Sequence, residues 1–257
     1  MPMDIVVSDV NIPGEGGRTM AAHVARPRAP GKYPVVMVII EAFGLNHHIE
    51  DVAERFARQG YVSIAPDLYY REGARATAAY ADLAGARRLM GSIVDSKYVE
   101  DARRVLDYLR KQDYALVSRL GTVGFCMGGR LSFLTACQMS DDVKACAVFY
   151  GGRIVTRDRT AGAPVPPVEM TPALKAPVLG FFGDLDAGIP LDDVKELEAT
   201  LKKAGKSGEF HVYQGAPHGF FCDERGTFRP DAAGDAWQRT LGFFQQHLKT
   251  GTPAGGR

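Results

Sequence analysis

Short apolar runs alternate with amphipathic segments of helical period along most of the chain, and this alternation limits the folds that it can adopt. The run at 35–40 is continuous and rich in β-branched residues, as expected of a strand covered on both faces. Such alternation predicts a mostly parallel, doubly wound α/β sheet with helices on both faces. We expect further strands at 61–65, 120–125, 145–150, 177–182 and 209–213, and helices at 46–59, 97–109, 127–139, 191–204 and 232–248.

The organisation of the chain indicates one folded unit. Residues 5–10 and 19–25 flank a glycine-rich turn and are expected to form an antiparallel β extension. Residues 73–91 are compatible with a helix, and 151–173 are expected to form a long, proline-containing loop of the kind that often caps a site. We expect a single domain over 1–249 and a flexible tail over 250–257.

Charge and cysteine content exclude several classes of protein. The chain has 31 Lys and Arg against 30 Asp and Glu, so no basic excess favours a nucleic-acid partner. Its longest apolar run is far too short to cross a bilayer. Four cysteines without a CxxC pair suit neither a disulfide scaffold nor a zinc ribbon. We expect a cytoplasmic protein without metal or cofactor, as a monomer or weak homodimer.

One motif indicates chemistry. Gly124-Phe125-Cys126-Met127-Gly128 fits the pattern G-x-nucleophile-x-G, placed between an expected strand and an expected helix. A thiol at that turn lies at a helix N-terminus, where the dipole favours an anion. The alternative interpretation is a buried cysteine in a glycine-rich turn.

Partners for this thiol follow later strands. Asp184 and Asp186 come after the strand at 177–182, and His218 comes after the strand at 209–213. Ligands of open α/β sheets bind at the carboxyl ends of strands, and hydrolases of this kind order their residues as nucleophile, acid and histidine. We prefer Asp186 to Asp184 because it lies deeper in its loop. Asp beside Gly is also common in plain turns, and a loop His is often merely solvated.

A carboxylate also ends the central strand. Glu41 follows the apolar run at 35–40, where burial of a charge is costly unless it has partners. It is either a hydrogen-bonded structural residue or a group near the thiol, with an oxyanion-binding N–H from the adjoining residue.

These motifs together resemble the dienelactone hydrolase family over nearly the whole chain. They are EAFGLN at 41–46, APDLY at 65–69, GFCMGG at 124–129, GDLD at 183–186 and HGF at 218–220. The resemblance implies the α/β-hydrolase fold and a Cys126–His218–Asp186 triad. It also implies oxyanion donors at the N–H groups of Met127 and Ala42, and a Glu41 that contacts the thiol and helps to generate the thiolate.

The resemblance further implies a substrate class. Members of the family hydrolyse a carboxylate-bearing enol-lactone (carboxymethylenebutenolidase activity) during degradation of chlorinated aromatic compounds, and bind the carboxylate with two arginines. One arginine lies four residues after the histidine, where this chain has Cys222. The other has no unique counterpart among Arg71, Arg75, Arg87 and Arg88. We expect substrate contacts at Phe43, Arg71, Arg75, Tyr150 and Phe220.

Two other functions fit the sequence less closely. One is a broad carboxylesterase or thioesterase that acts on small acyl compounds. The other is a non-catalytic thiol sensor, in which an oxidisable Cys126 at a helix N-terminus reacts without acyl turnover. A sensor does not need the ordered set of cysteine, aspartate and histidine, so we favour the hydrolase.

Overall fold

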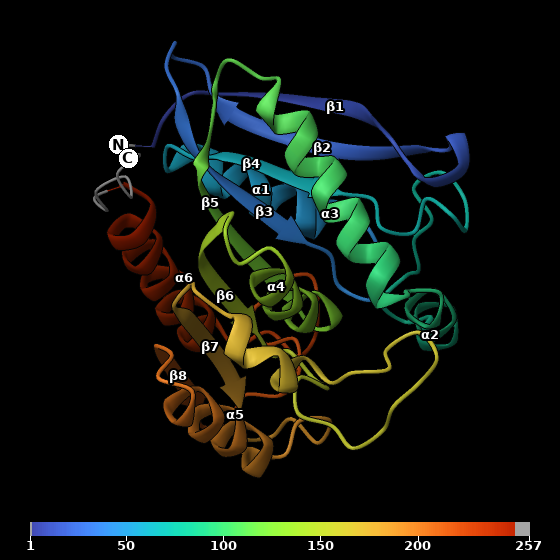
Figure 1. The fold of residues 1–257 in the computed structure, drawn as a ribbon, viewed down its shortest axis with the longest axis vertical. Helices are drawn as coiled ribbons and strands as arrows, with labels where there is room; N and C mark the ends of the chain where they lie inside the picture. The colour runs from blue at the N-terminus through green and yellow to red at the C-terminus, as the bar shows by residue number, and fades with distance from the viewer. Residues whose placement is uncertain (1, 250–257) are drawn as a thin grey trace.

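A twisted β-sheet runs through the middle of the protein (Figure 1), for which a computed structural model describes residues 2–249. Within this range eight strands form one sheet in the order β1-β2-β4-β3-β5-β6-β7-β8. Strands β3 to β8 are parallel, whereas β2 pairs antiparallel with both β1 and β4. The strands are β1 (Ile5–Pro13), β2 (Thr19–Pro27), β3 (Tyr33–Ile39), β4 (Val62–Pro66), β5 (Ala115–Phe125), β6 (Val143–Phe149), β7 (Val178–Gly183) and β8 (Gly208–Tyr213).

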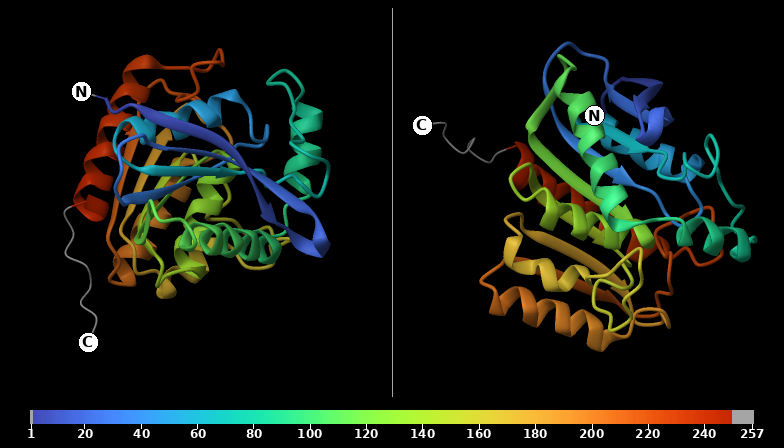
Figure 2. Two further views of the ribbon diagram at one scale, coloured as in Figure 1. Left: turned by 90° about the horizontal axis from the view of Figure 1, so that it is seen from above. Right: turned by 45° about the vertical axis from the view of Figure 1, so that its right-hand side comes forward.

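Helices cover both faces of this sheet (Figure 2). On one face, Phe56 of α1 packs against Trp237 and Phe244 of α6. On the other face α4 lies against β5 and β6 and is flanked by α3. The α-helices are α1 (His47–Arg58), α2 (Leu83–Gly91), α3 (Asp95–Arg110), α4 (Met127–Gln138), α5 (Leu191–Lys203) and α6 (Pro230–Phe244), with short helical turns at η1 (Glu15–Gly17), η2 (Pro167–Ala173) and η3 (Gln245–Lys249). No helix in the described range is long and apolar enough to span a membrane.

The apolar core follows the central strands. Every residue from Val35 to Ile40 is fully buried, as the continuous apolar run predicts for a strand covered on both faces. Helix α1 begins where Asn46 accepts a hydrogen bond from the Ile49 N–H, and its apolar face is buried on the sheet. The carboxyl ends of the parallel strands therefore meet at one edge of a rigid sheet.

The expected parallel sheet and the antiparallel β1–β2 extension are confirmed. The helix expected over 73–91 is shorter in the structure, where only α2 is helical. The preceding loop is held instead by Asp67, whose carboxylate accepts from the N–H groups of Tyr69 and Arg75. The loop at 151–173 contains η2 at its end. The single domain expected over 1–249 stays a prediction, and the tail expected at 250–257 lies outside the described residues.

Candidate active site

Cys126 occupies a strained turn between β5 and α4. Its φ of 58° and ψ of −121° lie in a region that side chains rarely adopt, and its N–H donates to the Phe149 carbonyl at 3.0 Å. Gly124 and Gly128 allow this turn, since a Cβ on Gly124 would overlap the Gly128 carbonyl and one on Gly128 would overlap the carbonyl of Ile39. The motif thus forces the Cys126 side chain to the edge of the sheet.

His218 and Asp186 lie beside this turn. The Nδ1 of His218 is 2.6 Å from Asp186 Oδ2, and this carboxylate is buried. Asp186 Oδ1 accepts from the Gly188 N–H at 2.9 Å, which fixes the carboxylate within its own loop. The ring of Tyr150 packs edge-on against the imidazole, with centroids 5.1 Å apart.

The charge state of His218 follows from these contacts. Burial lowers its pKa, but the hydrogen bond to Asp186 and the interaction with the Cys126 sulfur outweigh burial and raise the pKa to about 10. A histidine with this pKa holds its proton at neutral pH. The structure therefore brings Cys126, His218 and Asp186 together, although they lie far apart in the sequence.

Asp184, the other aspartate weighed from the sequence, has a different position. Its carboxylate accepts from the Gly215 N–H at 2.6 Å, and the Leu185 N–H donates to the Ala216 carbonyl at 3.1 Å. These bonds fasten the loop after β7 to the loop after β8. Asp184 thus joins the two loops, while Asp186 faces the imidazole.

Glu41 is fully buried at the end of β3. Its Oε1 accepts from the Tyr150 hydroxyl at 3.3 Å and lies 3.8 Å from Nη1 of Arg225. Its Oε2 and the Arg225 Nη1 have no hydrogen-bond partner within residues 2–249. Buried polar atoms usually form hydrogen bonds. Glu41 Oε2 is therefore an acceptor, and Arg225 Nη1 a donor, that another group could still bind.

Ala42 and Met127 are joined by Tyr69. The Tyr69 hydroxyl donates to the Ala42 carbonyl at 3.1 Å and contacts the Met127 sulfur at 3.7 Å. Met127 is the first residue of α4, where N–H groups lack helical acceptors. A single buried hydroxyl therefore contacts both residues whose N–H groups are the expected oxyanion donors.

An apolar wall faces Cys126. It consists of Phe43 after β3 and of Ala78, Tyr80 and Ala86 from the loop before α2 and from α2 itself. The Ala78 N–H donates to the Phe43 carbonyl at 3.1 Å, which attaches this loop to the site. The guanidinium of Arg225 lies 5.2 Å from the ring centroid of Phe43 and 5.6 Å from that of Tyr80.

The structure shows other partners for four of the residues expected to contact substrate. Arg71 is bound to Asp101 and Glu15, and Arg75 is bound to Asp9 and Glu50, so neither guanidinium is directed to the thiol. Tyr150 and Phe220 are fully buried and pack against each other, so both support the site from behind. Phe43 lies on the wall beside Cys126, and its contact with substrate stays a prediction.

The sequence did not single out Arg225, Tyr80 or Tyr69 as site residues. Arg225 follows the histidine by seven residues rather than four, so the spacing of the family pattern misses it. Tyr80 lies in a segment whose helical pattern is weak, although its hydroxyl accepts from Asn46 at 3.0 Å. Tyr69 is the last residue of the APDLY motif at 65–69, and this position was the only indication in the sequence that it belongs to the site.

The sheet order and the strained strand–turn–helix at Cys126 define an α/β hydrolase. The model of the dienelactone hydrolase family matches residues 20–248, and the chain belongs to that family. It is therefore a hydrolase that acts on ester or lactone bonds.

Individual relatives extend over almost the whole chain. A Synechocystis protein named "Putative carboxymethylenebutenolidase" is 36% identical over 251 residues, covering 97% of this chain and 100% of the relative. An Escherichia coli O157:H7 protein of the same name is 36% identical over 244 residues, covering 95% and 88%. A crystal structure titled "Putative Dienelactone Hydrolase", from Klebsiella pneumoniae, superposes with a TM-score of 0.87 at 34% identity, covering 95% of this chain and 100% of that one.

Proposed function

We propose that this protein hydrolyses a carboxylate-bearing lactone through a thioester formed on Cys126. The observation that carries the proposal is the contact of one imidazole with two groups: His218 donates to Asp186 at 2.6 Å and interacts with the Cys126 sulfur. This is the arrangement that nucleophilic catalysis needs, with a nucleophile, a proton carrier and a group that orients the carrier.

Acylation and deacylation use the same groups. The Cys126 thiolate attacks the acyl carbonyl carbon, and the bond from that carbon to the ring oxygen breaks. His218 gives its proton to this oxygen, which leaves as an alcohol or enol still tethered to the acyl group. The neutral imidazole then takes a proton from water, the hydroxide attacks the thioester, and the thiolate leaves. Asp186 stabilises the imidazolium and fixes its orientation.

The oxyanion of each tetrahedral intermediate is assigned to the N–H groups of Ala42 and Met127. Donors of this kind contribute roughly 10²–10³-fold each to the rate. Tyr69 supports the assignment, because its hydroxyl contacts both residues. We assign Glu41 to the formation of the thiolate, as the family resemblance implies; it is fully buried, and its Oε2 has no hydrogen-bond partner within residues 2–249.

Arg225 is the residue that we assign to the substrate carboxylate. It is mostly buried, its Nη1 has no hydrogen-bond partner in the described range, and it lies against the wall that faces Cys126. A buried donor that lies near Glu41 but lacks a hydrogen bond favours a further anionic partner. An aromatic or conjugated acyl group would fit against Phe43 and Tyr80. A role in degradation of aromatic compounds and a cytoplasmic location remain predictions from the sequence.

The nucleophile is tested with Cys126→Ala. We expect loss of turnover on a dienelactone and on p-nitrophenyl acetate, and loss of iodoacetamide labelling at neutral pH. Cys137→Ala is the matched control, since burial raises the pKa of the Cys137 thiol to about 12 and keeps it protonated. The nucleophile assignment is wrong if Cys126→Ala keeps the wild-type rate on both substrates.

Arg225→Met tests the substrate class and separates this proposal from a broad carboxylesterase. We expect kcat/KM to fall by roughly tenfold or more on the dienelactone, because a charged hydrogen bond contributes about 1.5–3 kcal/mol. The neutral ester serves as an internal control and should change much less. Equal losses on both substrates would favour the carboxylesterase.

A further inference from the structure

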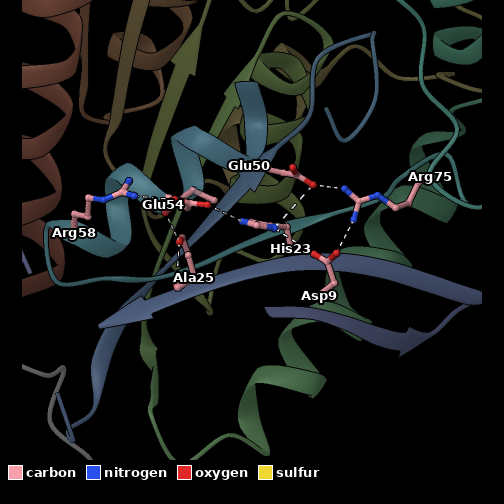
Figure 3. Close-up of polar contacts among 9 residues, drawn as sticks. Asp9, His23, Ala25, Glu50, Glu54, Arg58 and Arg75 are labelled. Atoms are coloured by element: carbon pink, nitrogen blue, oxygen red, sulfur yellow. Dashed lines mark hydrogen bonds and ion pairs between the residues drawn. The ribbon is translucent and has the colours of Figure 1, made fainter. Parts of the chain in front are cut away.

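A second cluster of polar side chains lies where the β1–β2 extension meets α1 (Figure 3). His23 of β2 faces Asp9, its direct partner across the β1–β2 ladder. Glu50 and Glu54 lie one turn apart on α1, on either side of the imidazole. Strands β4 and β3 separate β2 from β5, which leads to Cys126, so the cluster is distinct from the candidate active site.

The geometry of three of these residues suits a small cation. The Nδ1 of His23 is 3.2 Å from Asp9 Oδ1 and 3.9 Å from Glu50 Oε1, and one ligand atom from each residue lies within 4.8 Å of the others. Ligand atoms about 2 Å from a tetrahedral metal are separated by about 3.3 Å. Small adjustments of two carboxylates would therefore bring all three atoms to bonding distance.

His23 is only 5% exposed, and its Nε2 has no hydrogen-bond partner within residues 2–249. That atom is 3.9 Å from Glu54 Oε1, and Glu54 is itself held by Arg58 at 2.8 Å. If Nδ1 binds a metal, Nε2 must carry the proton and direct it at this carboxylate. A histidine between a metal and a carboxylate is the usual second layer of a zinc site.

The charges of the cluster leave room for a cation. Three carboxylates (Asp9, Glu50 and Glu54) face two guanidinium groups, so one negative charge is left over when the imidazole is neutral. One of the two, Arg75, bridges Asp9 and Glu50 and so occupies the side of the cluster that a metal would approach. The Arg75 side chain is 36% exposed on a loop, and it can turn into solvent.

We propose that Asp9, His23 and Glu50 form a binding site for a divalent cation of the zinc type, with Arg75 as an internal cation that competes for it. One imidazole with two carboxylates is a donor set that suits zinc and is unlike the all-oxygen sets that calcium and magnesium prefer. The site binds the metal at the junction of β1, β2 and α1 and takes no part in the hydrolysis.

The test is a zinc titration of the full chain without a polyhistidine tag, after chelator treatment, in competition with a chromophoric chelator. Cys126→Ala is the background, because the Cys126–His218 pair could itself bind zinc. We expect one saturable site. Cobalt(II) should give a visible spectrum of tetrahedral nitrogen and oxygen ligation, without a sulfur-to-metal charge-transfer band.

Variants of the cluster should change zinc affinity in opposite directions. His23→Gln and Asp9→Asn should abolish the saturable site, and Asp9 is exposed enough for its variant to fold normally. Glu54→Gln should weaken binding by roughly 10–100-fold. Arg75→Gln should tighten binding, because it removes the competing cation. His47→Gln is the matched control, since His47 forms an exposed pair with Glu224 and should leave affinity unchanged.

Several results would overturn the proposal. Zinc binding that is equal in the background and in both His23→Gln and Asp9→Asn would be adventitious. Absence of saturable binding in both the background and Arg75→Gln would show that the carboxylates serve only the internal ion pairs. Weaker binding after Arg75→Gln would contradict the competition.

Discussion

Replacement of Asp186 by asparagine tests the coupling between His218 and its carboxylate most directly. Burial lowers the pKa of His218. The 2.6 Å hydrogen bond to Asp186 and the charge of this carboxylate raise it, together with the interaction with Cys126, to about 10. A carboxylate at such a distance commonly shifts a pKa by about 1–3 units. We therefore expect the pKa of His218 to fall to about 7–9 in Asp186→Asn.

The sign of the pH effect follows from the role of the imidazolium. His218 must hold a proton to give to the leaving oxygen, so acylation declines as pH rises through its pKa. A lower pKa moves that alkaline decline to lower pH. The rate near neutral pH should also fall by about 10²–10⁴-fold, or about 3–5 kcal/mol, because the amide neither stabilises the imidazolium nor fixes its tautomer.

The assay is the rate of ring opening of the dienelactone under single-turnover conditions, measured between pH 5 and roughly 10.5, with stability checked by urea unfolding. Asp184→Asn is the matched control, because Asp184 lies two residues away and binds the Gly215 N–H rather than the imidazole. The reasoning fails if Asp186→Asn keeps the wild-type rate and profile, or if Asp184→Asn reproduces its defect.

Three further variants test the surroundings of the site. Tyr69→Phe removes the hydroxyl that holds Ala42, so kcat should fall by roughly tenfold with little change in KM, as steady-state kinetics would show. Arg130→Met leaves the buried Asp95 carboxylate unpaired and should lower the free energy of unfolding by about 3–5 kcal/mol in urea titrations. Gly128→Ala places a Cβ against backbone carbonyls and should destabilise the fold by about 1–3 kcal/mol in the same titrations.

Much of the sheet could be predicted because its central strands are buried on both faces and consist largely of apolar residues. The run at 35–40 is an example, and every residue in it is fully buried. The segment at 73–91 was harder to predict. Its composition favours a helix throughout. The Asp67 carboxylate, however, accepts a hydrogen bond from the Arg75 N–H, and the segment before α2 is a loop. That hydrogen bond depends on tertiary structure and leaves no local pattern.

The same limit applies to the site. Cys126, Asp186 and His218 could be proposed because each follows the end of a strand, and parallel strands place those ends at one edge. Arg225 reaches Glu41 only through the path of a long loop after His218, which no spacing rule describes. The cluster of Asp9, His23 and Glu50 combines two strands and a helix, so its members look unrelated in sequence.

The backbone angles of Cys126 have a consequence for how this protein tolerates mutation. With φ at 58°, a side chain costs roughly 1–3 kcal/mol of conformational strain, which glycine would relieve. Cys126→Gly should therefore be as stable as the natural chain or more so, while lacking the sulfur. Selection for thermal stability alone would therefore favour replacement of Cys126 by glycine and yield an inactive protein. The cysteine is retained only where turnover itself is under selection.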